Sequence, residues 1–333
     1  VESHAVCPSI VNLYVVPIQP IMSIAITPKI ESPRAAALPA FALAKCKADS
    51  SLLAQVAVAK YVDHLPLYRQ EQSFRREDLA LSRRTLDDWL LELADEPLLP
   101  LYAALKAELL ARAVLFTDDT PVPLQVKGRG KTKAARLWVY RGATGPPLAV
   151  YDFTPDRTKA RPQQFLGAYR GWIHADAYSG YDELFRQDDI IEVGCWTHTR
   201  RYFDEAVSSA PGEAAEFLAL IRRLYQVETA AASLSDAARA ALRTEQAGPV
   251  VQHVFQRGAQ LLTTALPKSP LGQALGYLLH QRVALQRYLT DGRLRPDNNL
   301  AENVIRPLAL GRKNWMFCGS ERGGRAAALY FSL

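Results

Sequence analysis

The sequence predicts an α/β protein in which helices cover a mixed β-sheet. Three observations predict this fold class. Strand-like segments follow one another between residues 113 and 154, strands and helices then alternate as far as residue 212, and residues 213–295 have helical spacing without a strand signal. A meander that runs into strand–helix alternation is typical of a mixed sheet with helices on its faces.

Length and composition narrow the class of protein. The chain has 333 residues, more than one hydrophobic core usually holds, so we expect two or more folding units. Hydrophobic residues make up 49% of the chain and charged residues 22%, which excludes a largely disordered protein. The formal net charge of +6 favours a polyanionic partner. Many basic proteins bind nothing acidic, so charge alone leaves the partner open.

The cysteines and the N-terminal residues indicate the compartment. Four cysteines, at positions 7, 46, 195 and 318, form no Cys-x-x-Cys pair, so neither a zinc ribbon nor a disulfide framework is expected, and a reducing cytoplasm fits best. Residues 1–47 are punctuated by prolines, and we expect an irregular segment there. These prolines argue against a membrane-spanning helix, and no basic region precedes the apolar stretch as in a signal peptide. The chain begins with Val1 and not methionine, which suggests a fragment or a truncated reading frame.

Residues 48–112 are expected to form a helical domain. The stretch that begins at Ser50 has helical spacing, and another helix is expected near LYAALKAELLARA. Behind a candidate N-cap at Ser82, apolar residues recur at helical intervals: Leu86, Trp89, Leu90 and Leu93. Two short helices joined at LALS resemble a helix-turn-helix that binds DNA, although many helical hairpins share this pattern.

Residues 113–212 are expected to contain five strands. The first three are AVLFTDD (113–119), RLWVYRG (136–142) and PLAVYDFT (147–154). A helix near ARPQQFLGAY, strand GWIHADAY, helix YDELFR, strand DIIEVGCW and helix HTRRYFDEAVSS follow. This order matches a ribonuclease H-like core.

The helical stretch 213–296 separates these strands from a last segment, 297–333. We interpret the stretch as an insertion, after which the chain returns to the core with a helix that carries Glu302. Locally, Asn299 and Glu302 also fit a helix-capping box, and Glu302 with Arg306 fits a surface i, i+4 pair worth about 0.2–0.5 kcal/mol. The residues near Glu302 therefore allow a structural role as well as a chemical one.

Two aspartates and this glutamate are candidate metal ligands. Period-2 alternation turns Asp118 to one face of the first strand and Asp119 to the other, so only one of them can join a given site. Asp176 lies where the apolar run of the fourth strand ends. Three such carboxylates suit Mg²⁺ or Mn²⁺, and paired ions support in-line phosphoryl displacement. Without metal their charges would repel and raise at least one pKa. Taken singly, each aspartate is more often a turn or cap residue.

Seven segments in order resemble bacterial transposases of the insertion sequence 66 type, from about residue 48 to the end. They are AKYVDHLPLYRQEQ, LSRRTLDDWL, LFTDDTPV, GKTKAARLWVY, HADAYSGYDELF, GCWTHTRRYFDEA and DGRLRPDNNLAENVIRPLALGRKNWMFCGSERGGRAAALY. The resemblance implies a metal-dependent Asp-Asp-Glu enzyme whose catalytic and metal-binding residues are Asp118, Asp176 and Glu302, with two Mg²⁺ or Mn²⁺ ions. It implies cleavage of DNA at the ends of a mobile element, transfer of a 3′-hydroxyl end into target DNA, and action as a homo-oligomer on paired ends.

Polar and basic residues around the acids are candidate contacts to DNA phosphates. They are His198, Arg200, Arg201, Asn299, Arg306, Arg312 and Lys313. A solvated basic face is the alternative for the arginines and lysine near Glu302. Cys195 and His198 have the spacing of half a zinc site, but no second pair accompanies them, so zinc is not expected.

The chain departs from the transposase pattern in three respects. Such transposases usually carry an upstream coiled coil and a cysteine-rich zinc motif, and they continue past the end seen here, whereas this chain offers only Cys7-Pro8. Where they have Asp-Glu-Thr, this chain has Asp118-Asp119-Thr120, which leaves the aligned ligand in place. The main hypothesis is an active transposase. The alternatives are a catalytically inactive, truncated DNA-binding protein and a nuclease of the same fold that cuts without joining.

Overall fold

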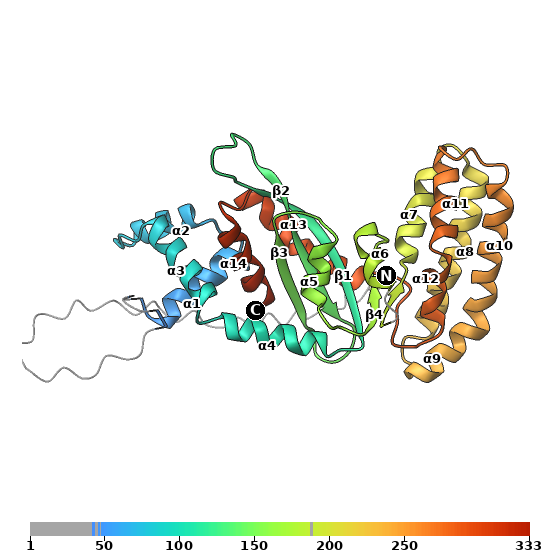
Figure 1. The fold of residues 1–333 in the computed structure, drawn as a ribbon, viewed down its shortest axis with the longest axis horizontal. Helices are drawn as coiled ribbons and strands as arrows, with labels where there is room; N and C mark the ends of the chain where they lie inside the picture. Colours follow the sequence, from blue (N-terminus) through green and yellow to red (C-terminus); the bar gives the residue numbers. More distant parts are fainter. Residues whose placement is uncertain (1–41, 44–45, 47, 187–188) are drawn as a thin grey trace, which may run out of the picture. The chain divides into compact units, whose positions relative to one another are not determined.

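The computed structural model describes residues 42–43, 46, 48–186 and 189–333, so most of the expected irregular segment 1–47 lies outside the described residues. The described chain begins with four helices (Figure 1), namely α1 (Ser50–Tyr61), α2 (Leu67–Arg76), α3 (Arg83–Asp95) and α4 (Leu99–Leu110). Ser82 caps α3, as predicted, because its side chain accepts a hydrogen bond from the Thr85 backbone N–H at 3.1 Å. The helical reading of residues 48–112 is therefore confirmed.

The described residues form a five-stranded mixed sheet in the order β3-β2-β1-β4-β5. Its strands are β1 (Val114–Leu124), β2 (Lys133–Gly142), β3 (Ala149–Thr154), β4 (Gly171–His174) and β5 (Ile190–Val193). The pairs β1–β2 and β2–β3 are antiparallel, whereas β1–β4 and β4–β5 are parallel. The helices after β3, β4 and β5 are α5 (Ala160–Leu166), α6 (Asp182–Phe185) and α7 (Trp196–Ala206). The predicted α/β class and mixed sheet are confirmed.

β1 continues five residues beyond its predicted end at Asp119. Pro121 and Pro123 concealed this extension, because a proline has no N–H to give to a central ladder. β4 pairs only with Val114–Phe116. The edge of β1 that would face β4 is therefore not paired with β4 at Pro121 and Pro123, and no hydrogen bond to β4 is missing there. Cys318 lies beside the extension instead, and its backbone N–H donates to the Pro123 carbonyl at 2.8 Å.

Each face of the sheet carries its own hydrophobic core. Val114 and Phe116 of β1 belong to one core, whereas Leu115 of β1 and Ile173 of β4 belong to the other. This alternation confirms the predicted face assignment along β1. Helices α4, α5 and α6 cover the second core, through Leu109, Phe165 and Leu184 among others.

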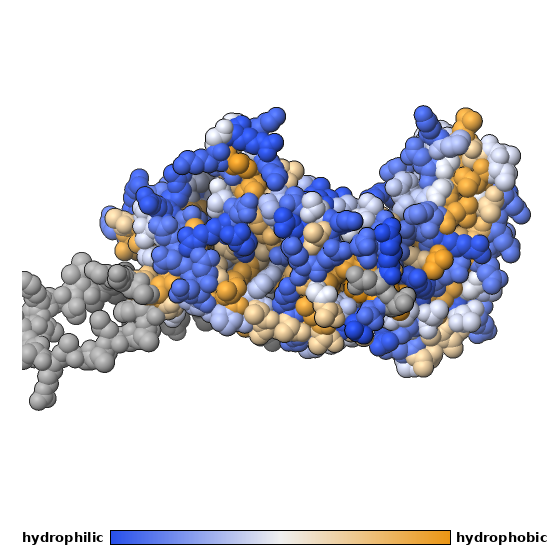
Figure 2. Space-filling view, in the orientation of Figure 1, coloured by the Kyte–Doolittle hydropathy of each residue, from blue (hydrophilic) through white to orange (hydrophobic). Residues whose placement is uncertain are grey.

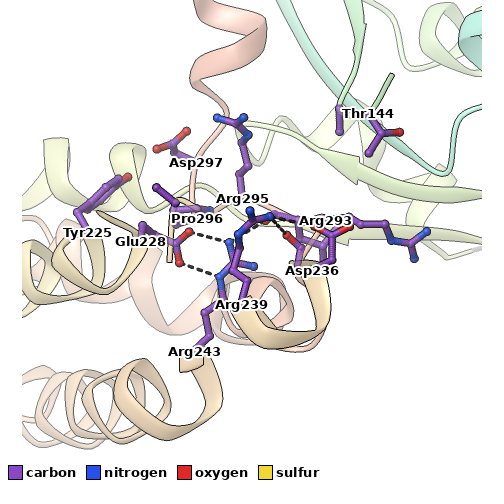
Figure 3. A pocket seen from close by; sticks show the side chains of 14 residues that line it. Thr144, Tyr225, Glu228, Asp236, Arg239, Arg243, Arg293, Arg295, Pro296 and Asp297 are labelled. Atoms are coloured by element: carbon purple, nitrogen blue, oxygen red, sulfur yellow. Dashed lines mark hydrogen bonds and ion pairs between the residues drawn. The ribbon is translucent and has the colours of Figure 1, made fainter. Parts of the chain in front are cut away.

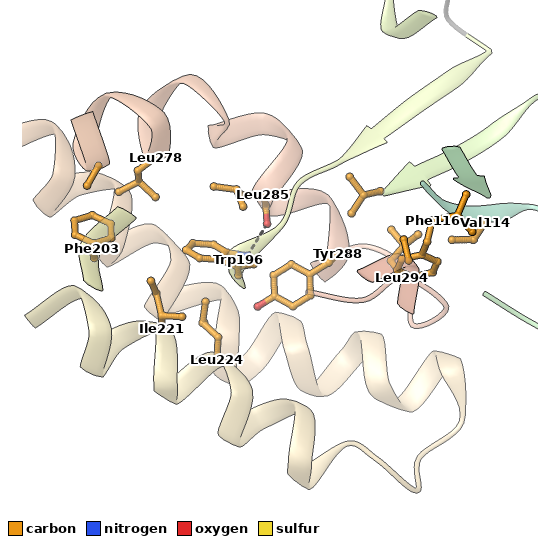
Figure 4. Close-up of a cluster of buried hydrophobic side chains, with 14 of the residues drawn as sticks. Val114, Phe116, Trp196, Phe203, Ile221, Leu224, Leu278, Leu285, Tyr288 and Leu294 are labelled. Carbon is orange, nitrogen blue, oxygen red and sulfur yellow. Dashed lines mark hydrogen bonds between the residues drawn. The ribbon is translucent and has the colours of Figure 1, made fainter. Parts of the chain in front are cut away.

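Residues 211–289 form the predicted helical block. It consists of α8 (Pro211–Ala230), α9 (Asp236–Leu242), α10 (Gly248–Leu262), α11 (Pro270–His280) and α12 (Arg282–Gln286), with a π-helical turn at Arg243–Ala247 and a short 3₁₀ turn at Arg287–Leu289. Figure 4 shows that its side chains join those of β1 in one cluster, with Trp196 between Ile221 and Phe116. The Trp196 indole N–H donates to the Leu285 carbonyl at 3.1 Å, and its backbone N–H donates to the Pro296 carbonyl at 2.8 Å. The block therefore shares its core with one face of the sheet.

Two further helices complete the chain, α13 (Asn299–Trp315) and α14 (Glu321–Ser332). α13 packs on β1 and is the predicted returning helix. α14 is not predicted by the sequence as a separate element; it packs against β3 and α3 and so connects the N-terminal helices to the sheet. The Tyr330 hydroxyl, for example, donates to the Leu90 carbonyl at 2.9 Å. Every helix in the described ranges is either too short or too polar to span a lipid bilayer.

Candidate active site

Asp118 and Asp119 lie next to each other on β1 and have different surroundings. The Asp119 side chain is 3% exposed and forms ion pairs with Arg157 at 2.7 Å and Arg136 at 3.0 Å. Two guanidinium groups therefore neutralise its charge. Asp118 lies on the opposite face with Phe116, and within the described part of the chain no arginine or lysine pairs with it. Of the two aspartates, Asp118 is the one that is free to bind a ligand.

Asp176 lies two residues beyond the end of β4. Because β1 and β4 are parallel and Phe116 is opposite His174, Asp118 and Asp176 follow equivalent points of neighbouring strands. The rings of Phe116 and His174 stack with 4.1 Å between their centroids, which stabilises this register. The Asp176 carboxylate also accepts a hydrogen bond from the Tyr178 backbone N–H at 3.2 Å. The alternative interpretation of Asp176, as a residue that stabilises a turn, is therefore also consistent with the structure.

Glu302 lies in the first turn of α13, and the capping box expected around it is wrong. The N-cap of α13 is Asn298, whose side chain makes no capping hydrogen bond, and Asn299 is already inside the helix. Glu302 and Arg306, which were expected to pair, form no ion pair in the described structure. The Glu302 carboxylate instead lies 3.9 Å from Nδ1 of His198, and its side chain is 32% exposed.

The three acids influence one another electrostatically. Burial raises the pKa of Asp118 to about 7, and the negative charges of Asp176 and Glu302 add to this rise. The three carboxylates nevertheless do not form a group whose ligand atoms all lie within 4.8 Å of one another among the described residues. In the described ranges, the one group of three potential ligand atoms within 4.8 Å of each other comes from Cys195, His198 and Glu302. The acids therefore share a region, while Glu302 is directed toward His198.

The donor atoms differ in how well they suit a cation. The carboxylates of Asp118, Asp176 and Glu302 suit Mg²⁺ or Mn²⁺, and a cation would relieve the repulsion that contributes to the raised pKa of Asp118. Cys195 suits a metal poorly, because it is 1% exposed and burial raises the pKa of its thiol to about 12. Its Sγ also accepts the Asn298 backbone N–H at 3.3 Å. Only the thiolate is a good metal ligand, so Cys195 would have to lose its proton to any metal bound there.

His198 lies on α7 next to the candidate acids. Burial lowers the pKa of His198, and the positive charge of Arg201 adds to this effect. The imidazole is therefore neutral near pH 7, and its contact with Glu302 joins a neutral ring to a carboxylate. Its Nδ1 is buried without a hydrogen-bond partner among the described residues. This nitrogen lies where it can hold the glutamate side chain.

Asn298 ties the start of α13 to β1, a role that the sequence analysis missed. The residue is fully buried, and its Nδ2 donates to the Thr117 carbonyl at 2.8 Å. Thr117 precedes Asp118, so this bond links the strand of one acid to the helix of another. The available signal was the asparagine pair at the start of the returning helix, because an amide side chain can donate to a strand carbonyl.

Two arginines of the helical block hold the segment that leads into α13 (Figure 3). The guanidinium of Arg243, a residue that is 1% exposed, forms a two-point ion pair with Glu228, at 2.6 and 2.7 Å. It also donates to three carbonyls of the segment, those of Tyr288, Asp291 and Leu294. Arg239 donates to the Gly292 carbonyl at 2.7 Å. A pocket of about 410 Å³ lies here, and its lining includes Asp297 but none of the three acids.

The predicted DNA-binding residues fall into two groups. His198, Arg200 and Arg201 on α7, and Asn299 and Arg306 on α13, lie within about one helical turn of a candidate acid or of His198. Arg312 and Lys313 lie in the last turn of α13. Arg312 is ten positions after Glu302, which corresponds to ~15 Å of helix. Contact of all seven residues with DNA stays a prediction. Arg312 and Lys313 would contact DNA at a distance from the candidate acids.

Comparison with known proteins identifies the family. The family model described as Transposase IS66 family matches residues 45–326, a range that contains the sheet, the helical block, α13 and the candidate acids. The chain belongs to the Transposase IS66 family. The resemblance expected from the seven sequence segments is thereby confirmed.

Relatives of this IS66 family chain occur in Sinorhizobium fredii strain NBRC 101917 / NGR234. The uncharacterized protein y4qI is 35% identical over 297 residues, which cover 85% of this chain and 55% of the relative. The uncharacterized protein y4jD is 31% identical over 300 residues, which cover 86% of this chain and 58% of the relative. The IS66 family chain therefore spans somewhat more than half the length of these curated relatives.

Proposed function

We propose that this chain carries the catalytic part of a DNA transposase that cleaves insertion-sequence ends and transfers them into target DNA. The observation that carries the proposal is the convergence of three acids from distant parts of the chain. Asp118 and Asp176 follow equivalent points of the paired strands β1 and β4, and the start of the helix that carries Glu302 is hydrogen-bonded to Thr117, beside Asp118. Membership of the Transposase IS66 family supports DNA as the substrate. Action as a homo-oligomer on paired ends stays a prediction from the family resemblance.

The fold we propose is a ribonuclease H-like core with an inserted helical block. The strand order and the change from antiparallel to parallel pairing at β1 support this fold. The proposed division has a helical domain at 48–112, a core at 113–212 and 297–333, and an insertion at 213–296. In this division both aspartates belong to the first part of the core and Glu302 to the second.

We also propose that α2 and α3 form a helix-turn-helix-like unit. Arg83 and Arg84, at the start of α3, are exposed and can meet DNA phosphates. Asp88 and Glu92 follow on the exposed side of the same helix, and their charges would repel DNA. Contact by this unit would therefore be confined to the first turn of α3.

Asp118, Asp176 and Glu302 are the residues proposed to hold two Mg²⁺ or Mn²⁺ ions. Bound ions of this kind activate an attacking hydroxyl and stabilise a leaving oxygen at phosphorus. Asp118 must give up its proton for this role, and a nearby cation favours that ionised form. Arg201 and Arg306 are exposed and supply positive charge for the DNA phosphates. His198, whose Nδ1 lies 3.9 Å from the Glu302 carboxylate, is the residue proposed to orient that side chain.

The test uses duplex DNA that contains an IS66-type insertion-sequence end, incubated with the protein and Mg²⁺ or Mn²⁺. We expect nicked and joined products from the wild type. Asp118→Asn, Asp176→Asn and Glu302→Gln should each lose both products while they retain DNA binding, since a neutral amide is a poor ligand for these ions.

Glu205→Gln is the matched control, because Glu205 is exposed on α7 and has no assigned role. It should cleave like the wild type. Equal cleavage by the three acid variants and the wild type would contradict the proposal. DNA binding by the wild type without any metal-dependent product would favour the catalytically inactive alternative, and cutting without joining would favour the nuclease.

A further inference from the structure

The loop between β1 and β2 carries positive charges and no negative charge. Lys127, Arg129 and Lys131 are exposed in this loop, and Lys133 begins β2. Within the described part of the chain, none of the four forms an ion pair. An exposed loop with several like charges and no counter-charge attracts an anionic partner.

The tip of this loop does not pack on the rest of the protein. Gly128 and Gly130 have positive φ values of 80° and 68°, and nothing lies within 4 Å of the position of a Cβ on either. Figure 1 shows the loop extending past the neighbouring strands, and Figure 2 shows mainly hydrophilic residues in the same place. The basic side chains are therefore free to meet a partner.

A second basic group lies along the same hairpin. Arg312 and Lys313 end α13, and the Arg312 guanidinium donates to the Pro121 carbonyl of β1. The backbone contact between Cys318 and Pro123 holds the chain after α13 against this strand. We name the combined set the hairpin basic surface. It consists of Lys127, Arg129, Lys131, Arg312 and Lys313.

The length of β1 determines how far the loop residues of the hairpin basic surface lie from the candidate acids. Leu124 is six positions after Asp118 along the strand, which corresponds to ~20 Å, and the loop begins beyond Leu124. Successive nucleotides of one strand are about 3.4 Å apart along a DNA duplex. A duplex that passes both places would therefore extend over about six base pairs or more.

We propose that the hairpin basic surface binds the phosphate backbone of double-stranded DNA, and that its loop residues do so about six or more base pairs from the position of the three acids. The proposal rests on the proposed function for the identity of the polyanion. The three loop residues named offer charge, without the aromatic side chains that stack single-stranded bases. Contact with the duplex backbone, independent of base sequence, follows from this chemistry.

The test measures affinity for a DNA duplex of about 30 base pairs, by fluorescence anisotropy, between about 50 and 200 mM salt. We expect the variant Lys127→Gln/Arg129→Gln/Lys131→Gln to bind about 10- to 100-fold more weakly at the lower salt concentration. The slope of log affinity against log salt should also fall by about 2 to 3, since each lost phosphate contact removes ~0.9. The folded state should be unchanged, because these side chains have no ion pairs in the described structure.

The matched control is Arg222→Gln/Arg223→Gln/Lys268→Gln, which removes three exposed charges from the helical block. It should keep the wild-type slope. A wild-type slope in the hairpin variant, or an equal loss in both variants, would overturn the proposal, as would tighter binding to an RNA duplex of the same sequence. The variant Asp118→Asn separates the two proposals. The salt dependence of its DNA affinity should equal that of the wild type. If the variant still cleaves DNA in the presence of metal, only the catalytic assignment is contradicted.

Discussion

At the scale of single residues, neighbouring acids in this protein have opposite environments. The charge of Asp119 is neutralised by its ion pairs with Arg136 and Arg157. Asp118, one residue away, has a pKa raised to about 7, chiefly by burial. The one-residue step along a strand separates these environments, since successive side chains of a strand point to opposite faces. A residue type alone therefore does not assign a role here.

Asp152 on β3 shows the same effect of burial away from the candidate site. Burial raises its pKa to about 6, although Lys106 partly offsets the rise. The unfolded chain loses this proton near pH 4, and the folded chain retains it up to about pH 6. The free energy of unfolding therefore falls as the pH rises from about 4 to about 6, and stays lower above that.

We predict that Asp152→Asn is more stable than the wild type at about pH 7, by roughly 1 to 3 kcal/mol, because the amide carries no charge to bury. The gain should disappear at about pH 3, below both pKa values, where the wild-type carboxyl is protonated in both states. Denaturant unfolding at the two pH values measures the difference. An equal gain at both would show that ionisation of Asp152 is not the cause.

At the scale of secondary-structure elements, one buried amide ties the start of α13 to β1. Asn298→Ala removes the donor to the Thr117 carbonyl, and an unpaired buried carbonyl costs about 1–3 kcal/mol. We predict that this variant is destabilised by about that amount and needs more Mn²⁺ for half-maximal DNA cleavage, because Glu302 is no longer held in register with Asp118.

Asn303→Ala is the matched control, since Asn303 is exposed on the same helix. It should show the wild-type dependence on Mn²⁺. If Asn298→Ala loses stability and keeps the wild-type dependence on Mn²⁺, the residue supports the fold without positioning Glu302.

Much of the fold at this scale follows from the sequence. Alternation along β1 gave the correct face for Asp118, and the helical spacing gave α3 and its cap at Ser82. The extension of β1 through Pro121 was not predictable from local rules, because its tolerance depends on the short pairing with β4. The start of α13 likewise depends on contacts with β1 and α7. Because capping rules consider only neighbouring residues, they placed the N-cap at Asn299, one residue after the actual N-cap at Asn298.

At the scale of the whole molecule, the shared core makes the helical block and the sheet one unit. Phe217 of α8 is fully buried and stacks on Phe203 of α7 with 4.3 Å between ring centroids. The cluster that contains them also contains Phe116 of β1. Destabilising the block should therefore destabilise the sheet.

We predict that Phe217→Ala lowers the free energy of unfolding by about 3–5 kcal/mol. Far-ultraviolet circular dichroism and tryptophan fluorescence should report a single, coincident transition. Leu266→Ala is the control, because Leu266 is 75% exposed, and it should change stability by less than about 0.5 kcal/mol. Two separate transitions for Phe217→Ala would show that the block unfolds independently.

The long excursion of the chain into the helical block begins and ends at one place, because Trp196 is hydrogen-bonded to Pro296 and Cys195 to Asn298. Because the two ends of the helical block are joined, the loop between α10 and α11 can be lengthened or shortened without moving the junction. A change of length there should therefore leave the spacing of Cys195, Trp196 and Asn298 unchanged.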